Sequence, residues 1–248
     1  EDDFSQALMG VIHETGHALY EMGLPQDWRR QPVGTARGMA LHESQSLLFE
    51  MQVCRGPEFI NFAAPLMREA FGAEGPAWQA DNIQRHYCRV ARSFIRVDAD
   101  EVTYPLHVIL RTRLERGIIA DDLQIADIPG AWRDGMTELV GVAPDDDTDG
   151  CLQDIHWFDG IFGYFPTYTM GALAAAQLFV AAKASSPGLL DDIAEGNFAP
   201  LLAWLRNNVH EKASSATTDQ LLATATGTPL SVAAFKAHLG ARYLAPTG

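Results

Sequence analysis

The sequence has few cysteines and no pattern that would use them. Its 248 residues include three, Cys54, Cys88 and Cys151, which lie far apart and form no C-x-x-C motif. An odd number at these spacings gives no sign of a disulfide framework or of a cysteine-type zinc site. Unpaired cysteines are typical of a reducing compartment, so we expect the protein in the cytoplasm.

Basic side chains and long apolar runs are also scarce. Lysine and arginine number 18 against 32 aspartate and glutamate residues, which gives a net charge of −14. This balance disfavours nucleic-acid backbones and anionic membranes, because both need a cationic surface. The most apolar segment, residues 170–182, is interrupted by Gln177, and no run approaches the roughly 18 residues that a membrane span requires. We therefore expect no nucleic-acid partner and no membrane partner.

One short motif is distinctive, His13-Glu14-Thr15-Gly16-His17. It lies in residues 4–22, where apolar side chains recur at three- and four-residue steps and predict an amphipathic helix. Residues i and i+4 share a helix face, so His13 and His17 can direct two imidazoles at one cation. Glu14 lies beside them, where it can act on a metal-activated water. The alternative is that both imidazoles only pack in a helical core.

A catalytic zinc site usually has three protein ligands and one open position, so a third ligand is required. Glu21 is excluded because it lies about 12 Å beyond His13 along the helix axis. Glu43 and Glu50 share a face of the next predicted helix, residues 39–55. Antiparallel packing would return this helix to the histidines. From the residues alone, Glu43 is the better candidate and Glu50 is the rival.

The rest of the chain is predicted to be mostly helical, with glycine and proline marking the helix ends. Residues 93–100 contain β-branched residues in partial alternation, which favours a short strand or an extended segment and at most a small sheet. The acidic stretch 144–150 is predicted to be a turn or loop. Further helices are expected over residues 57–71, 78–91, 101–116, 128–140, 169–184 and, in several pieces, 189–243.

Four blocks of the sequence resemble the signature of one enzyme family. They are H-E-T-G-H at 13–17, H-E-S-Q-S at 42–46, I-R-V-D-A-D at 95–100 and G-C-L-Q-D-I-H-W at 150–157. In content and order they are similar to the signature blocks of the thermostable carboxypeptidase Taq-type metallocarboxypeptidases. A fifth block of that family, D-x-R-x-T, is absent. We therefore expect this chain to be the C-terminal part of a longer protein.

The resemblance implies a mainly α, helical gluzincin fold like that of neurolysin and angiotensin-converting enzyme. It implies zinc held by His13, His17 and Glu43, and so favours Glu43 over Glu50. It also implies that Glu14 is the general base and acid. Cobalt would suit the same ligands. We expect residues 1–248 to form a single helical catalytic region, with zinc-site helices in 4–55, substrate-site segments in 93–168 and C-terminal helices in 169–245.

Two further functions need residues outside the zinc-binding helices. The oxyanion that develops during hydrolysis needs a donor besides zinc. His156, Tyr168 and Tyr164 are candidates, because related gluzincins use a downstream histidine and tyrosine. A carboxypeptidase must also bind a free carboxylate, for which Arg96 offers a permanently charged, bidentate fork. The alternatives are core packing for the tyrosines, an orienting role for His156, and for Arg96 an ion pair with Asp98, Asp100 or Glu101.

The sequence thus predicts a zinc-dependent carboxypeptidase that releases single residues, with broad preference, from peptides with a free C-terminus. An oligoendopeptidase or a dipeptidyl carboxypeptidase on the same scaffold is one alternative. An inactive metal-binding fragment is another. The family resemblance also implies a homodimer.

Overall fold

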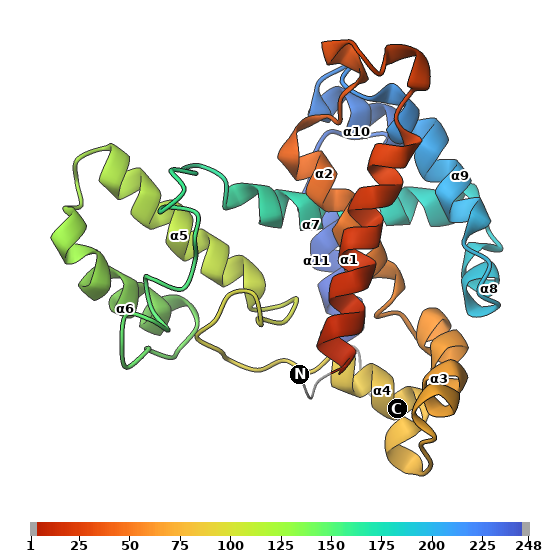
Figure 1. The fold of residues 1–248 in the computed structure, drawn as a ribbon, viewed down its shortest axis with the longest axis horizontal. Coiled ribbons are helices and arrows are strands. Elements are labelled where there is room, and N and C mark those ends of the chain that lie inside the picture. The colour runs from red at the N-terminus through yellow and green to blue at the C-terminus, as the bar shows by residue number, and fades with distance from the viewer. Residues whose placement is uncertain (1–3, 245–248) are drawn as a thin grey trace. The chain divides into compact units, whose positions relative to one another are not determined.

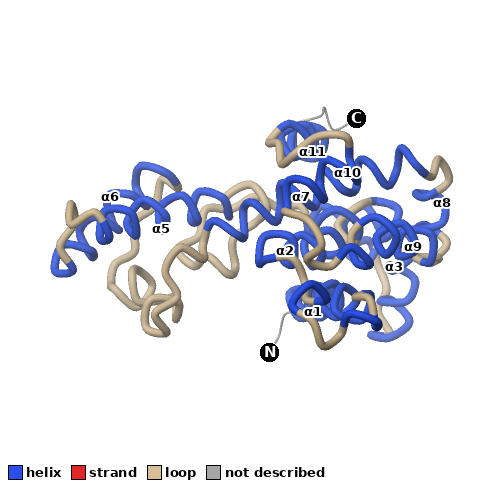
Figure 2. The backbone as a smooth tube through the Cα atoms, turned by 90° about the horizontal axis from the view of Figure 1, so that it is seen from above, coloured by secondary structure: helices blue, strands red, loops and turns tan. Residues whose placement is uncertain are grey.

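The computed structural model describes residues 4–244, and its regular elements are helices joined by loops and turns (Figure 1, Figure 2). No strand occurs within this range, so the predicted mainly α fold is confirmed. Among the same residues, no helix has both the length and the apolar character needed to cross a lipid bilayer.

The chain divides into two compact units. The first comprises Glu1–Cys88 and Met170–Gly248, and the second comprises Arg89–Thr169. The first unit holds the helices α1 (Phe4–Gly23), α2 (Gly38–Leu47), α3 (Pro57–Phe71), α4 (Ala80–Tyr87), most of α7 (Pro166–Ser185), α8 (Leu189–Ala194), α9 (Ala199–Asn208), α10 (Thr218–Thr226) and α11 (Ala233–Tyr243), with a π-helix at Leu48–Val53 and 3₁₀ turns at Gln26–Trp28, Pro32–Gly34, Pro76–Trp78 and His210–Lys212.

In the first unit, α1 packs along α2 and the π-helix that follows it (Figure 1). Gly16 permits this close approach. A Cβ atom at this position would lie 2.5 Å from the carbonyl oxygen of Gln45 and 2.6 Å from the Cα atom of Ser46. A larger residue here would push α1 away from α2, and with it the two histidines of the motif.

The predicted helices over 4–22, 57–71, 128–140 and 169–184 correspond closely to α1, α3, α6 and α7. The helix predicted at 39–55 is different. It is α-helical only to Leu47 and continues as a π-helix to Val53, where the Cys54 N–H donates to the Phe49 carbonyl at 2.8 Å. The helix predicted at 78–91 is shorter, because residues 76–78 form a 3₁₀ turn and α4 ends at Tyr87.

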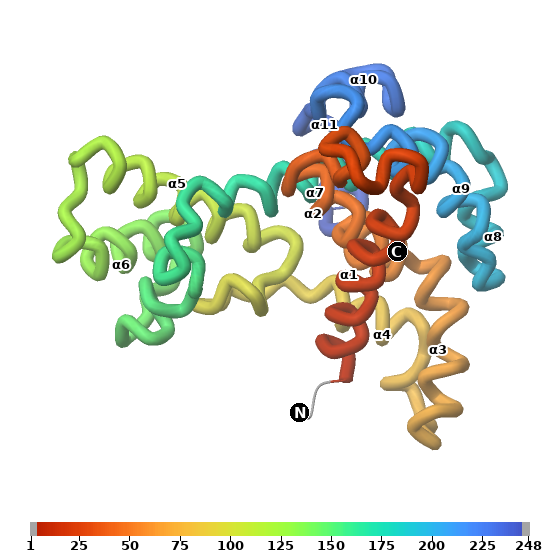
Figure 3. Tube along the Cα trace, turned by 45° about the horizontal axis from the view of Figure 1, so that its top comes forward, coloured from red at the N-terminus to blue at the C-terminus, as the bar shows by residue number. Residues whose placement is uncertain are grey.

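The second unit is a helical pair with long connecting loops. Its helices α5 (Tyr104–Ile119) and α6 (Ile128–Leu139) pack on each other, and a 3₁₀ turn at Ile125–Asp127 precedes α6 (Figure 3). The core between them contains Trp132, which is 1% exposed. Other buried residues of this core are Leu110, Leu114, Ile128, Met136, Val140 and Cys151.

Residues 93–100 were expected to form a short strand or an extended segment. The strand is wrong, because this segment is irregular, with bends at 94 and 96 and a turn at 97–98. The backbone there is satisfied by a side chain instead of a neighbouring strand. The Arg96 N–H donates to Gln153 Oε1 at 2.8 Å, and Gln153 Nε2 donates to the Phe94 carbonyl at 3.0 Å. One glutamine therefore replaces the pairing that a sheet would have supplied.

Candidate metal centre

Three potential metal ligands converge in the first unit. His13 and His17 lie on α1, Glu43 lies on α2, and one ligand atom of each lies within 4.8 Å of the others. Each imidazole Nε2 is 3.6 Å from a different oxygen of the Glu43 carboxylate. In a tetrahedral zinc site, bonds of about 2.1 Å place ligand atoms about 3.4 Å apart. The spacing observed here therefore fits a metal ion of that coordination.

The two imidazoles have different electrostatic surroundings. Burial disfavours the charged form of His13, but its hydrogen bond to Glu50 and the nearby Glu43 and Glu14 outweigh burial, so its pKa is raised. For His17, burial and then the neighbouring His13 and His42 lower the pKa to about 4. Metal binding requires neutral imidazoles. A metal ion therefore meets less competition from protons at His17 than at His13.

Glu43 is confined on α2 by the close approach of α7. Its side chain is 7% exposed. A Cβ atom at Gly171 would lie 2.8 Å from both Cβ and Cγ of Glu43. The absence of a side chain at Gly171 therefore leaves just enough room for the carboxylate arm, whose conformation α7 restricts.

The rival carboxylate, Glu50, contacts the opposite edge of the His13 ring. Its Oε2 is 2.9 Å from His13 Nδ1, whereas Glu43 faces Nε2 of the same ring. Glu50 also accepts from Arg55 Nη2 at 2.7 Å. The structure therefore brings Glu43, and not Glu50, together with the two histidines. Glu14 lies beside His13 on the exposed side of α1.

The other predicted site residues, Arg96, His156, Tyr164 and Tyr168, lie in the second unit. Arg96 is only 5% exposed and is held by Asp154, which accepts from its Nε at 3.0 Å and its Nη2 at 2.6 Å. Its Nη1 donates to the Tyr104 hydroxyl. Arg96 thus has an ion-pair partner 58 residues away in sequence, beyond the nearby acids that the sequence suggested.

His156 and Tyr168 are hydrogen-bonded partners. The Tyr168 hydroxyl and His156 Nε2 are 2.9 Å apart, and the Tyr164 ring lies 5.3 Å from the Tyr168 ring between centroids. Burial, with Arg96 as the next cause, lowers the pKa of His156. The lowered pKa favours the neutral form of His156, the partner of the Tyr168 hydroxyl.

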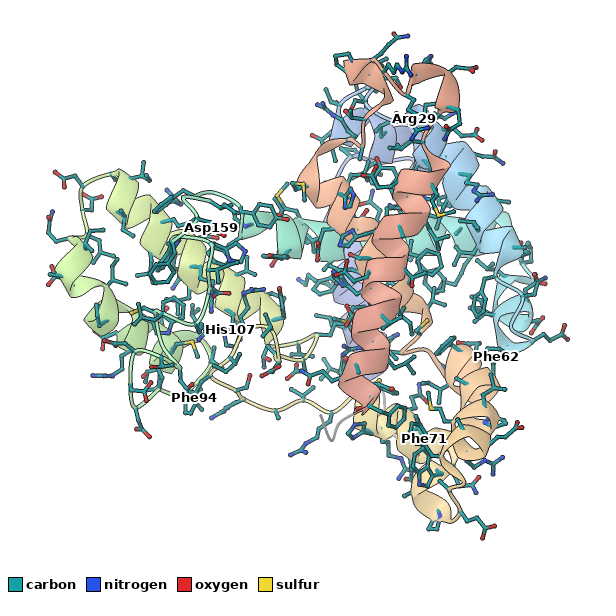
Figure 4. All side chains as sticks on the ribbon, in the orientation of Figure 1. Arg29, Phe62, Phe71, Phe94, His107 and Asp159 are labelled. Carbon is teal, nitrogen blue, oxygen red and sulfur yellow. The ribbon has the colours of Figure 1, made fainter. Side chains whose placement is uncertain are left out.

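Sequence reasoning missed a buried polar stripe on α5, made of His107, Arg111 and Glu115. Arg111 donates through Nε to Asp154 at 2.5 Å, and Glu115 accepts from Trp157 Nε1 at 2.9 Å. Figure 4 marks His107 on this helix. The sequence does carry a signal for this stripe, because three ionisable residues recur at four-residue steps and so share one face of the helix.

A helical fold with an H-E-x-x-H helix and a carboxylate from the next helix defines the gluzincin class of metallopeptidase. The family model of the carboxypeptidase Taq (M32) metallopeptidases matches residues 1–243. The chain belongs to this family, and the predicted helical gluzincin fold is thereby confirmed.

Known relatives support this assignment over the length of the chain. Thermostable carboxypeptidase 1 of Thermus thermophilus is 41% identical over 250 residues, which cover 100% of this chain and 48% of that protein. Carboxypeptidase 1 of Bacillus subtilis is 34% identical, over 98% of this chain and 48% of that protein. The chain spans about half the length of the curated relatives that it matches.

Solved structures agree with the sequence comparison. The chain superposes on Trypanosoma cruzi metallocarboxypeptidase 1 with a TM-score of 0.94 and 41% identity, covering 98% of this chain and 51% of that one. For an M32 carboxypeptidase from Deinococcus radiodurans the TM-score is 0.92 at 38% identity, covering 96% and 48%.

Proposed function

We propose that this chain carries the catalytic centre of a zinc-dependent metallocarboxypeptidase that releases single C-terminal residues from peptides. The observation that carries the proposal is the convergence of His13, His17 and Glu43, with ligand atoms within 4.8 Å of one another. Family membership supports the reaction class. Because the chain spans about half the length of its relatives, the activity is proposed for the protein of which this centre is a part.

His13 and His17 would bind the metal through Nε2, and Glu43 through its carboxylate. When bound, zinc supplies a Lewis acid that lowers the pKa of a coordinated water toward about 7 and polarises a carbonyl. The donor set of two imidazoles and one carboxylate leaves a position for water and substrate, as catalytic zinc sites do. Cobalt is compatible with the same donors.

Glu14 is the proposed general base and acid. It follows His13 directly on α1 and is exposed, so its carboxylate can accept a proton from the attacking water. It would then deliver that proton to the nitrogen of the departing residue, which cannot leave as an anion. A carboxylate serves both steps because it is returned to its ionised form at the end of each cycle.

Tyr168, with His156 as its hydrogen-bond partner, is the proposed donor to the developing oxyanion, and Tyr164 is its neighbour in the same cluster. Arg96 is the proposed partner of the substrate carboxylate. These roles rest on the resemblance of the blocks at 95–100 and 150–157 to the family's signature. Arg96 is already paired with Asp154, so its role requires the substrate to share the guanidinium with that carboxylate.

Paired peptides with free and amidated C-termini test the proposed activity in the zinc-loaded protein. A carboxypeptidase cleaves the free form and loses nearly all turnover on the amide. Equal cleavage of both would instead indicate an oligoendopeptidase, and release of dipeptides a dipeptidyl carboxypeptidase. If zinc binds but neither peptide is cleaved, the chain is an inactive metal-binding fragment.

Two further expectations complete the proposal. The odd number of cysteines favours a reducing cytoplasm, which fractionation of the native cell tests. The resemblance also implies a homodimer, for which light scattering after size exclusion gives the mass.

A further inference from the structure

The hydrogen bond on the far side of the His13 ring leads to a small network of charged groups. Glu50 bridges two partners with its two oxygens. Oε2 is 2.9 Å from His13 Nδ1, and Oε1 accepts from Arg55 Nη2 at 2.7 Å. The side chains of Glu50 and Arg55 are 12% and 14% exposed. The contact is therefore largely shielded from water, where a charge-assisted hydrogen bond is strong.

The π-helix determines where Glu50 lies. It adds one residue to the turn after α2, so the side chains that follow are rotated relative to the α-helical face that carries Glu43. Its i→i+5 hydrogen-bond pattern differs from that of an α-helix and leaves backbone carbonyl groups that need other donors. Arg242, from α11, donates through Nη1 to the Met51 carbonyl at 2.7 Å and through Nη2 to the Gln52 carbonyl at 3.5 Å. A distant helix thus stabilises the turn that positions Glu50.

The two carboxylates near His13 cannot exchange roles, because they face different ring nitrogens. Glu43 lies 3.6 Å from Nε2, and Glu50 lies 2.9 Å from Nδ1. A carboxylate on Nδ1 favours the tautomer in which that nitrogen carries the proton. The lone pair is then on Nε2, directed toward Glu43 and His17.

We propose that Glu50, held by Arg55 and by the π-helix, is a positioning residue that fixes the orientation and tautomer of His13 for metal binding. The inference rests on the proposed metal centre. A ligand whose ring is free to rotate loses affinity, and removing such a partner typically costs about 10–100-fold in metal affinity. Glu50 would contribute by this route and would form no bond to the metal.

Zinc affinity, measured on the full chain by competition with a chelator, tests the proposal. We expect E50A to weaken zinc binding by about 10–100-fold. In E50Q an amide oxygen still accepts from Nδ1 but carries no charge, so we expect a smaller loss. The cobalt absorption spectrum should shift in E50A, because the orientation of one imidazole ligand changes, and should be largely restored in E50Q.

Glu21→Ala is a matched control. Glu21 forms the same kind of carboxylate–imidazole pair, 2.9 Å from His42 Nε2, and also joins α1 to α2. His42 is not among the three converging ligands. We therefore expect the zinc affinity of E21A to stay within about threefold of that of the unaltered chain. This change is small beside the roughly 10–100-fold loss expected for E50A.

Three outcomes would overturn the proposal. One is zinc affinity in E50A within threefold of the unaltered chain, and another is an equal loss in E21A. The third is a loss in E50A as complete as that in E43A, since Glu50 would then be a ligand. If the unaltered chain fails to bind zinc, or E43A binds it normally, the metal centre itself is refuted. Should E50A fold poorly, the affinity and cobalt spectrum of E50Q decide the question.

Discussion

Each of the two units buries a carboxylate beside cationic or potentially cationic groups, but the partners differ in kind. In the first unit, Glu43 faces the imidazoles of His13 and His17 at 3.6 Å. In the second, Asp154 is paired with the guanidiniums of Arg96 and Arg111 at 2.6 and 2.5 Å. Arginine is permanently charged, whereas a neutral imidazole offers a lone pair. The first arrangement can accept a metal ion, whereas in the second the carboxylate is already paired with two permanent cations.

The protonation of Asp154 reflects this pairing. Burial alone would raise its pKa, but Arg111 and Arg96 outweigh burial, so the pKa of Asp154 is lowered. Its carboxylate remains ionised across the neutral range and holds the segment that carries His156. The difference between the units is thus one between an ion pair with permanent cations and a set of potential metal ligands.

The largest expected effect is on catalysis in the first unit. We expect E14Q to bind zinc normally and to lose peptide hydrolysis by about 10²–10⁴-fold, the usual contribution of a general acid–base group. Metal analysis and turnover should be measured on one preparation. Turnover in E14Q within tenfold of the unaltered protein would remove Glu14 from the mechanism.

The next largest effect should come from breaking the ion pair of the second unit. D154A would leave two buried guanidiniums without their counter-ion, so we expect a loss of about 3–5 kcal/mol in the free energy of unfolding. The loss should be the same with and without zinc. Urea denaturation followed by circular dichroism measures it.

An exposed ion pair in the same unit provides the control for D154A. Arg113 and Glu138 are 3.1 Å apart with side chains 54% and 66% exposed. E138Q should cost less than about 1 kcal/mol, because exposed pairs contribute little. A similar cost for D154A and E138Q would contradict the contrast between the units.

Removal of the Glu43 carboxylate in the first unit should change the stability of the chain only when zinc is present. Zinc at 100 times its dissociation constant should stabilise the unaltered chain by about 2.7 kcal/mol. In E43A this zinc-dependent rise in Tm should be absent, because one of three ligands is lost. Thermal unfolding with zinc and with a chelator measures the difference, and a full zinc response in E43A would exclude Glu43 as a ligand.

The smallest expected effect is on pH dependence. His107 is fully buried, and burial followed by Arg111 and Arg96 lowers its pKa from 6.5 to about 4. The unfolded chain therefore binds a proton at this imidazole more readily than the folded chain does. The contribution of neutral His107 to the free energy of unfolding is fully present above about pH 6.5 and is lost as the pH drops toward 4. At pH 5, protonation of His107 in the unfolded chain lowers the free energy of unfolding by about 2 kcal/mol.

Replacing His107 with leucine removes the contribution of this imidazole to the pH dependence of stability. We expect the free energy of unfolding of the metal-free H107L variant to fall less between pH 7.5 and 5 than that of the unaltered chain. His210, in the first unit, also has a pKa lowered to about 4 by burial and then Arg206, so H210L should flatten the profile to a similar extent. Parallel profiles for H107L and the unaltered chain would contradict the assignment.

Several features of the site followed from local sequence alone. The spacing of His13 and His17 places both on one face of any helix, and the apolar periodicity of residues 4–22 predicted that helix. The ends of α3 were predictable because Pro57 suits the first turn of a helix, and Gly72 adopts the left-handed conformation at its end (φ 56°).

Other features depended on contacts between residues far apart in the sequence. Periodicity could not distinguish Glu43 from Glu50, because both lie on one face of a regular helix. Their separation required the π-helix, the close approach at Gly171 and the Arg242 contact. The expected strand at 93–100 failed for the same reason, since Gln153, more than fifty residues away, satisfies its backbone.

The sequence by itself thus determined the helical class, the family and the placement of two histidines on one helix face, since these depend on spacing within single helices and on short contiguous blocks. Only the tertiary structure decided which carboxylate faces Nε2 of His13, which faces Nδ1, and that Arg96 pairs with Asp154. Hydrogen bonds and ion pairs form at a few ångströms between groups that chain folding brings together, and sequence separation carries little information about those distances.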